Sequence, residues 1–236
     1  MEAKQIRTLA RERLQGTWGI SIGVAAVACL LGGLLVGGSF LPELEIREQL
    51  ENASLGEILY SAFQAINGAG LVGYGILTSL LGFASFILGG VIQLGYSKFL
   101  LKQYYGQNLE FNDLFSEFDR FGTGFAQAFL RGLYITLWSL LLIVPGIVAS
   151  YRYAMTPFIL IDHPEMTASQ AIACSKAMMN GHKGELFYLD LTFLGWGLLA
   201  ALTMNLGHLA LNPYRNAAYA VFYKNLTQSQ QGRWEV

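Results

Sequence analysis

The sequence has little charge. Only 13% of its 236 residues are Asp, Glu, Lys or Arg, whereas a soluble domain usually has about 25%. The charges are also unevenly spread, and four long runs carry none: Trp18–Leu41, Asn67–Ser97, Gly132–Tyr151 and Leu191–Tyr214. Each run is at least as long as the roughly 20 apolar residues that a helix needs to cross a bilayer. This scarcity argues against a soluble domain and predicts an all-α, polytopic transmembrane helical bundle.

Catalytic and ligand-binding motifs are missing as well. The sequence has no H-E-x-x-H, no G-x-S-x-G and no phosphate-binding G-x-x-x-x-G-K-[ST]. Its three histidines lie in different segments without the spacing of metal ligands. The stretch "GAGLVG" (68–73) matches G-x-G-x-x-G, but it opens an apolar helix and follows no strand. The sequence therefore predicts no catalytic residues, no cofactor, no metal site and no enzymatic activity.

The charge-free runs predict six spans within one membrane domain, 1–236. We expect the spans at about 18–41, 70–97, 126–144, 147–162, 186–204 and 206–225. Lysine and arginine are enriched in cytoplasmic loops, which places the N-terminus, the loops 98–124 and 163–184, and the C-terminal tail in the cytoplasm. The acidic loop 42–67 is then outside. An alternative has a kinked third span and a C-terminal helix that lies at the interface.

A Pro-Gly pair interrupts the longest apolar region. The 38 residues of 125–162 would measure about 57 Å as one helix, which is more than a bilayer's thickness. Proline lacks a backbone donor and glycine tolerates a turn. We therefore expect a helical hairpin that breaks at Pro145 and Gly146, at the outer surface of the membrane.

Three polar segments predict short interfacial amphipathic helices. Ser54–Glu57 and Thr167–Gln170 match the capping-box pattern of a helix start. Between Asn112 and Phe121, four apolar residues form a stripe beside three acids. Membrane-binding helices usually have a basic polar face, so we expect this third segment to pack along the cytoplasmic rim of the protein itself. The "GISIG" stretch (19–23) predicts close helix packing, within one chain or at a dimer seam.

Charges inside the predicted spans give the only candidate site. Charged groups are costly within a bilayer and indicate a functional site by default. At 1.5 Å per residue, Arg152, Asp190 and Arg215 all lie about 10–15 Å above the inner rim. Asp190 can neutralise one arginine, and the other needs carbonyls, water, tyrosine hydroxyls such as those of Tyr151 and Tyr153, or an anionic ligand. Arg131 is expected to reach the inner interface along its aliphatic stem.

Several motifs along 90–230 resemble one family. They are "VPGI", "YRYAMT", "SKAMMNGHK", "FLGW", "NPY" and "FY". Together they are similar to the bacterial integral-membrane family catalogued as domain of unknown function 975. The resemblance implies a cytoplasmic-membrane protein with about six spans and no assigned activity. A more distant similarity, to the membrane domain of some glycerophosphodiester phosphodiesterases, implies a role near lipids.

Two functions follow as hypotheses. The first is a non-enzymatic protein of the bacterial cytoplasmic membrane, with both termini cytoplasmic, that acts as a scaffold or partner for other membrane proteins. The second is a binder or transporter of an anionic lipid or solute through the Arg152, Asp190 and Arg215 layer. The expected partners are membrane lipids and other membrane proteins. Nucleic acid is not expected, since the basic residues are few and dispersed, and the oligomeric state is open.

Overall fold

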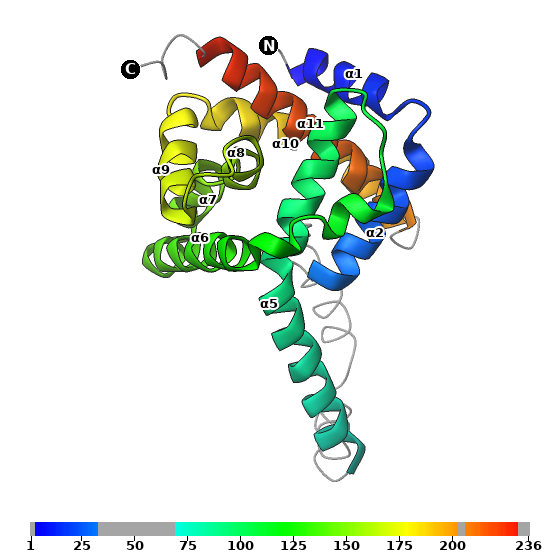
Figure 1. The fold of residues 1–236 in the computed structure, drawn as a ribbon, viewed down its shortest axis with the longest axis vertical. Helices are drawn as coiled ribbons and strands as arrows, with labels where there is room; N and C mark the ends of the chain where they lie inside the picture. The colour runs from blue at the N-terminus through cyan, green and yellow to red at the C-terminus, as the bar shows by residue number, and fades with distance from the viewer. Residues whose placement is uncertain (1–2, 33–68, 203–205, 231–236) are drawn as a thin grey trace.

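The computed structural model describes residues 3–32, 69–202 and 206–230, and its regular elements there are all helical (Figure 1). The α-helices are α1 (Ala3–Leu14), α2 (Trp18–Gly32), α5 (Ala69–Tyr104), α6 (Phe121–Leu141), α7 (Ile143–Arg152), α8 (Thr156–Asp162), α9 (Ala168–Met178), α10 (Lys183–Leu202) and α11 (Leu206–Gln230). Two short 3-10 helices, η2 (Phe111–Phe115) and η3 (Phe118–Arg120), lie between α5 and α6. The predicted all-α class is confirmed. The expected outer loop 42–67, with its capping box, lies outside the described residues.

Helix α1 is an element that the charge pattern does not reveal. It buries Ile6, Ala10 and Leu14, which recur every fourth residue and so share one face. This face packs near α11, where the Tyr214 hydroxyl donates a hydrogen bond to the Arg7 carbonyl (3.1 Å). Helix α1 and the last turns of α11 lie at the same end of the molecule (Figure 1).

The C-terminal half of α5 packs among the other helices, and α5 contacts α2, α6, α8, α11 and η2; its N-terminal half projects away from the labelled helices (Figure 1). Glycines allow its closest contacts. A Cβ at Gly90 would come within 2.2 Å of the Gly124 carbonyl oxygen in α6, and one at Gly95 within 2.0 Å of the Leu114 carbonyl oxygen. Figure 1 shows α6 running crosswise to α5, and the Gly90–Gly124 contact is where the two backbones touch.

The expected hairpin is present, but its break lies earlier than Pro145 and Gly146. Helices α6 and α7 pack against each other, and the chain turns at Leu142, whose φ of −163° and ψ of 149° are extended. Pro145 falls in the first turn of α7, where its missing N–H is not needed. A Cβ at Gly146 would lie 2.1 Å from the Ser139 hydroxyl oxygen, so this glycine serves close packing of the two helices.

The predicted spans do not all coincide with single helices of the structure. The expected span 147–162 is divided between α7 and α8, and α11 runs through Pro213. By length and composition, Val144–Asp162 is the one long apolar stretch in the described residues that could cross a membrane, and half of it is buried. A core helix of a soluble protein has the same properties, so the six-span bundle stays a prediction.

The loop helix α9 follows its sequence signals. The Gln170 amide donates to the Thr167 hydroxyl (3.4 Å), and the Thr167 amide donates to the Gln170 side chain (2.8 Å). This is the expected capping box. Gly181, with a φ of +88°, ends the turn that follows α9.

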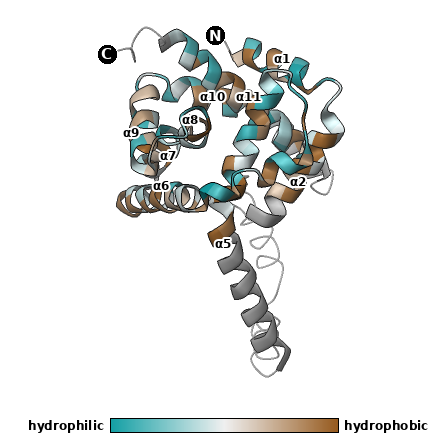
Figure 2. Ribbon diagram, viewed as in Figure 1, coloured by the Kyte–Doolittle hydropathy of each residue, from teal (hydrophilic) through white to brown (hydrophobic). Residues whose placement is uncertain are grey.

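Most of the exposed large apolar side chains among the described residues lie on two surfaces. The hairpin surface comprises Leu133, Leu137, Trp138, Leu140, Leu141, Leu142, Val144, Ile147 and Val148 of α6, α7 and the turn between them. The α10 surface comprises Phe187, Tyr188, Leu191, Leu194, Trp196 and Leu199. Figure 2 shows hydrophobic colours along α6 and hydrophilic colours near the end of α11. The apolar exposure is therefore concentrated on particular helices.

Candidate functional site

The Asp190 cluster joins three helices through one carboxylate. The Tyr151 hydroxyl of α7 donates to Asp190 Oδ2 (2.9 Å), and the Tyr219 hydroxyl of α11 donates to the same oxygen (2.6 Å). The other oxygen, Asp190 Oδ1, is buried and has no hydrogen-bond partner. Two neutral donors thus hold this α10 carboxylate in place.

The arginines of the predicted site, Arg152 and Arg215, do not pair with Asp190 in the described part of the chain as the sequence predicts. Arg215 acts electrostatically on the Tyr151 and Tyr219 hydroxyls, so its charge lies near the Asp190 cluster. No ion pair among the described residues joins Asp190 to an arginine. The sequence interpretation expected an arginine to neutralise Asp190, and in the structure two tyrosine hydroxyls donate hydrogen bonds to it instead. The contact recorded for Arg152 is through its backbone carbonyl, which accepts from the Ser175 hydroxyl (3.0 Å).

Tyr153 lies apart from the Asp190 cluster. It is buried against Ala149 and Ile172, and its ring is 5.8 Å from that of Tyr134. Of the five residues in the predicted site, the structure therefore brings Tyr151 and Asp190 together and places Arg215 nearby. It gives no contact between that cluster and the side chain of Arg152 or Tyr153.

A second polar group, the α5–α6 clasp, consists of Gln93, Gln127 and Arg131. Arg131 Nη2 and Gln127 Nε2 both donate to Gln93 Oε1, at 3.0 and 3.3 Å. Gln127 is fully buried, and its Oε1 has no partner. The Arg131 guanidinium turns toward α5, and the expectation that it reaches the inner interface stays a prediction.

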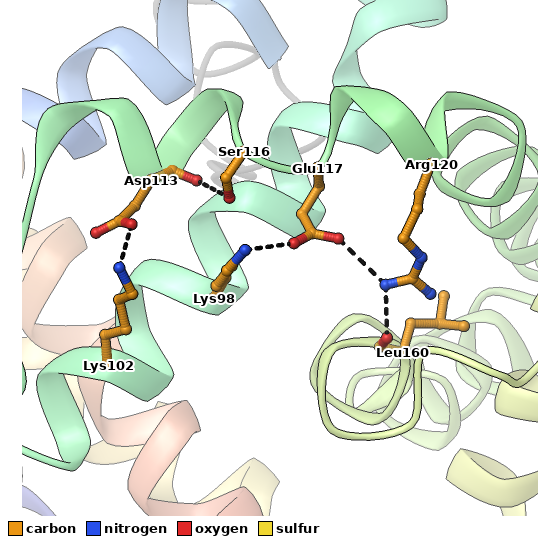
Figure 3. A network of polar contacts seen from close by, with 7 residues as sticks. All are labelled: Lys98, Lys102, Asp113, Ser116, Glu117, Arg120 and Leu160. Atoms are coloured by element: carbon orange, nitrogen blue, oxygen red, sulfur yellow. Dashed lines mark hydrogen bonds and ion pairs between the residues drawn. The ribbon is translucent and has the colours of Figure 1, made fainter.

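The rim network connects α5, the 3-10 segment and α8 (Figure 3). Lys98 Nζ lies 2.8 Å from Glu117 Oε1, and Lys102 pairs with Asp113. Arg120 bridges Glu117 (3.1 Å) and the Leu160 carbonyl (3.0 Å). The acids face inward here: Asp113 and Glu117 are 6% and 7% exposed, whereas the aromatic residues Phe111 and Phe118 are 44% and 39% exposed.

A further rim contact aligns α8 with α11. Lys224 Nζ lies 2.6 Å from Asp162 Oδ2, and the Tyr223 hydroxyl donates to the same oxygen (2.8 Å). Lys224 also lies 4.9 Å from the centre of the Tyr105 ring. The last residue of α8 is therefore in direct contact with α11.

The spacing of the charges could have indicated the rim network. Lys98 and Lys102 are four residues apart, and so are Asp113 and Glu117. Residues four apart share a helix face, so two matched pairs of opposite charge can meet across a loop. The sequence interpretation expected this segment to pack along the cytoplasmic rim but did not pair its acids with Lys98 and Lys102.

The polar groups described above hold helices in position. No group of three or more His, Cys, Asp or Glu side chains within the described ranges could hold a metal ion. The Asp190 cluster and the rim network link helices through charge-assisted hydrogen bonds, which are about twice as strong as neutral ones. Both therefore fix helix positions.

One comparison with known proteins gives a match. Residues 140–230 match the family model described as "Protein of unknown function (DUF975)". No curated protein and no solved structure shows a significant match. The matched region runs from the end of α6 to the end of α11 and so includes the whole Asp190 cluster. The match supports the resemblance to the DUF975 family of proteins of unknown function over residues 140–230 of this chain.

Proposed function

We propose that this is a non-enzymatic, multi-pass protein of the bacterial cytoplasmic membrane that acts as a scaffold or partner for other membrane proteins. The observation that carries the proposal is the contrast between its surface and its interior. Apolar side chains are exposed on the hairpin and α10 surfaces, while lysines and acids pair with one another at the rim, each pair with at least one largely buried partner.

The exposed surfaces support insertion into a bilayer. On α10, Leu194, Trp196 and Leu199 are 61%, 58% and 56% exposed, and on the hairpin Leu140 is 79% exposed. Contiguous apolar patches of this kind mark membrane or protein contacts in stable proteins. Buried polar side chains in a membrane protein are held by partners on neighbouring helices, as Asp190 is by two tyrosines.

The alternative, binding or transport of an anionic lipid or solute at the predicted charge layer, has weaker support. It needs Arg152 and Arg215 to converge on one ligand. Arg215 lies near the Asp190 cluster, but no contact links Arg152 to that cluster within the described residues. A carboxylate beside the ligand position would also repel an anion.

The proposal is tested by photo-cross-linking in intact bacterial cells. A photoreactive residue at Leu194, on the α10 surface, should give discrete adducts with membrane proteins after alkaline carbonate extraction of the membranes. The matched control is the same residue at Phe193, which is 3% exposed and should cross-link within the chain. Release of the protein by carbonate would contradict membrane integration. Lipid adducts alone at Leu194 would contradict the scaffold role.

A further inference from the structure

The α5–α6 clasp leaves a cation without a counter-charge. Arg131 makes one hydrogen bond, to the neutral Gln93 amide, and none of the ion pairs in the described ranges includes it. It is only partly exposed. The rim lysines differ, since each has a carboxylate partner. A guanidinium in this environment is stable only when an anion or several acceptors complete its hydrogen bonds.

A second atom of the clasp also lacks a partner. Gln127 is 0% exposed, and its Oε1 accepts no hydrogen bond. Its Nε2 is engaged by Gln93 Oε1 (3.3 Å) and the Gly90 carbonyl (3.5 Å), both acceptors, which fixes the orientation of the amide. Buried polar atoms in native proteins are almost always satisfied. The clasp therefore presents unused donors on Arg131 and an unused acceptor on Gln127, four residues apart on one face of α6.

The depth of the clasp suits a headgroup. Gln93 precedes Lys98 of the rim network by five residues, which is about 7–8 Å along α5. Under the proposed orientation, this depth lies just within the cytoplasmic leaflet.

We propose that the α5–α6 clasp binds a phosphate-type oxyanion that also carries a hydroxyl group. The anionic oxygens accept from the Arg131 guanidinium, which pairs with phosphate through two parallel bonds, and the hydroxyl donates to Gln127 Oε1. The anion is the phosphodiester of a lipid headgroup or a free phosphate ester. The site shares no residue with the Asp190 cluster. The lipid form of this inference rests on the proposed membrane location.

Gln93→Glu is the decisive variant. Its carboxylate has the shape of the glutamine amide and accepts the same two hydrogen bonds, from Arg131 and Gln127. It also supplies the negative charge that Arg131 lacks, so it competes with the ligand while preserving the fold. Arg152→Gln is the matched control, because it removes a positive charge whose side chain makes no contact with the clasp. Arg131→Gln is the second variant, which removes the cation itself.

The experiment is native mass spectrometry of protein from mixed phosphatidylglycerol and phosphatidylcholine micelles, with inorganic phosphate and glycerol phosphate as separate additions. We expect wild type and Arg152→Gln to retain phosphatidylglycerol, and folded Gln93→Glu and Arg131→Gln to retain about tenfold less. If the two variants lose bound glycerol phosphate and retain phosphatidylglycerol as wild type does, the free ester is the ligand. Equal retention by wild type and folded Gln93→Glu would overturn the inference, as would equal loss in Arg152→Gln. Carbonate extraction of the same membranes separately tests the proposed location.

Discussion

The rim network and the Asp190 cluster hold helices together in different ways. At the rim, lysines meet carboxylates: Lys98 meets Glu117, and Lys224 meets Asp162. In the Asp190 cluster, the carboxylate meets two tyrosine hydroxyls and no arginine. Burial does not separate the two regions, because Glu117 and Lys224 of the rim contacts are buried whereas Asp190 is partly exposed. The difference lies in the partners: cations balance the rim carboxylates, and neutral hydroxyl donors hold Asp190.

The largest effect is expected from preventing the approach that forms the rim network. In Gly95→Ala, the new Cβ would lie 2.0 Å from the Leu114 carbonyl oxygen, which is backbone and cannot move aside cheaply. The segment that brings Asp113 to Lys102 would be displaced, at a cost of about 3 kcal/mol. Thermal unfolding of wild type and Gly95→Ala in mild detergent measures the loss of stability. The control is Gly122→Ala, where a Cβ meets nothing within 4 Å; equal stability of the two variants would refute the packing described.

Removal of a rim acid comes next. Glu117→Ala leaves Lys98 and Arg120 without their shared carboxylate. Loss of one partner of a buried pair costs about 3–5 kcal/mol. The side chain of Lys98 is 33% exposed, so water offsets part of that cost, and we expect about 2 kcal/mol. Asp119→Ala, at an exposed acid of the same segment, should cost less than about 0.5 kcal/mol. A neutral Glu117→Ala would show that the rim network is not structural.

A smaller effect is expected in the Asp190 cluster. Tyr219→Phe removes the 2.6 Å hydrogen bond to Asp190 and keeps the ring. The Tyr151 bond remains, so the loss should be about 1.5 kcal/mol, the lower end of the range for a hydrogen bond to a charged group. Tyr188→Phe is the comparison, because Tyr188 is 59% exposed on α10 and should tolerate the change. Chemical denaturation of the detergent-solubilised variants would distinguish them, and indistinguishable curves would rule out the cluster as a lock.

The smallest effect is expected at Arg152. Its side chain makes no hydrogen bond or ion pair in the described ranges, and its contact to Ser175 uses the backbone carbonyl. Arg152→Gln should therefore change the free energy of unfolding by less than about 0.5 kcal/mol. The measurement is the same denaturation curve. A loss of more than about 1 kcal/mol would restore Arg152 to the interior network that the sequence predicts.

The sequence predicts helix positions better than side-chain partners. Hydrophobic runs and capping signals locate α9, α10 and α11 because these patterns act within a few residues. The Leu142 break was not predicted, since close packing of Gly146 against Ser139 sets it rather than the proline. The partners of Asp190 and Arg131 also depend on which helix faces which, and that arrangement follows from long-range packing. The position of a residue along its helix can be counted from the sequence, whereas the neighbouring helix that its side chain faces cannot.

The most direct test of the membrane location is the accessibility of spin labels on α10 in reconstituted bilayers. Labels at Leu191 and Leu194, on the exposed α10 surface, should collide often with lipid-soluble oxygen and rarely with a water-soluble nickel chelate. A label at Glu185, an exposed residue in the first turn of α10, should show the reverse. Frequent collision of the Leu194 label with the nickel chelate would place the α10 surface in water and contradict the proposed insertion.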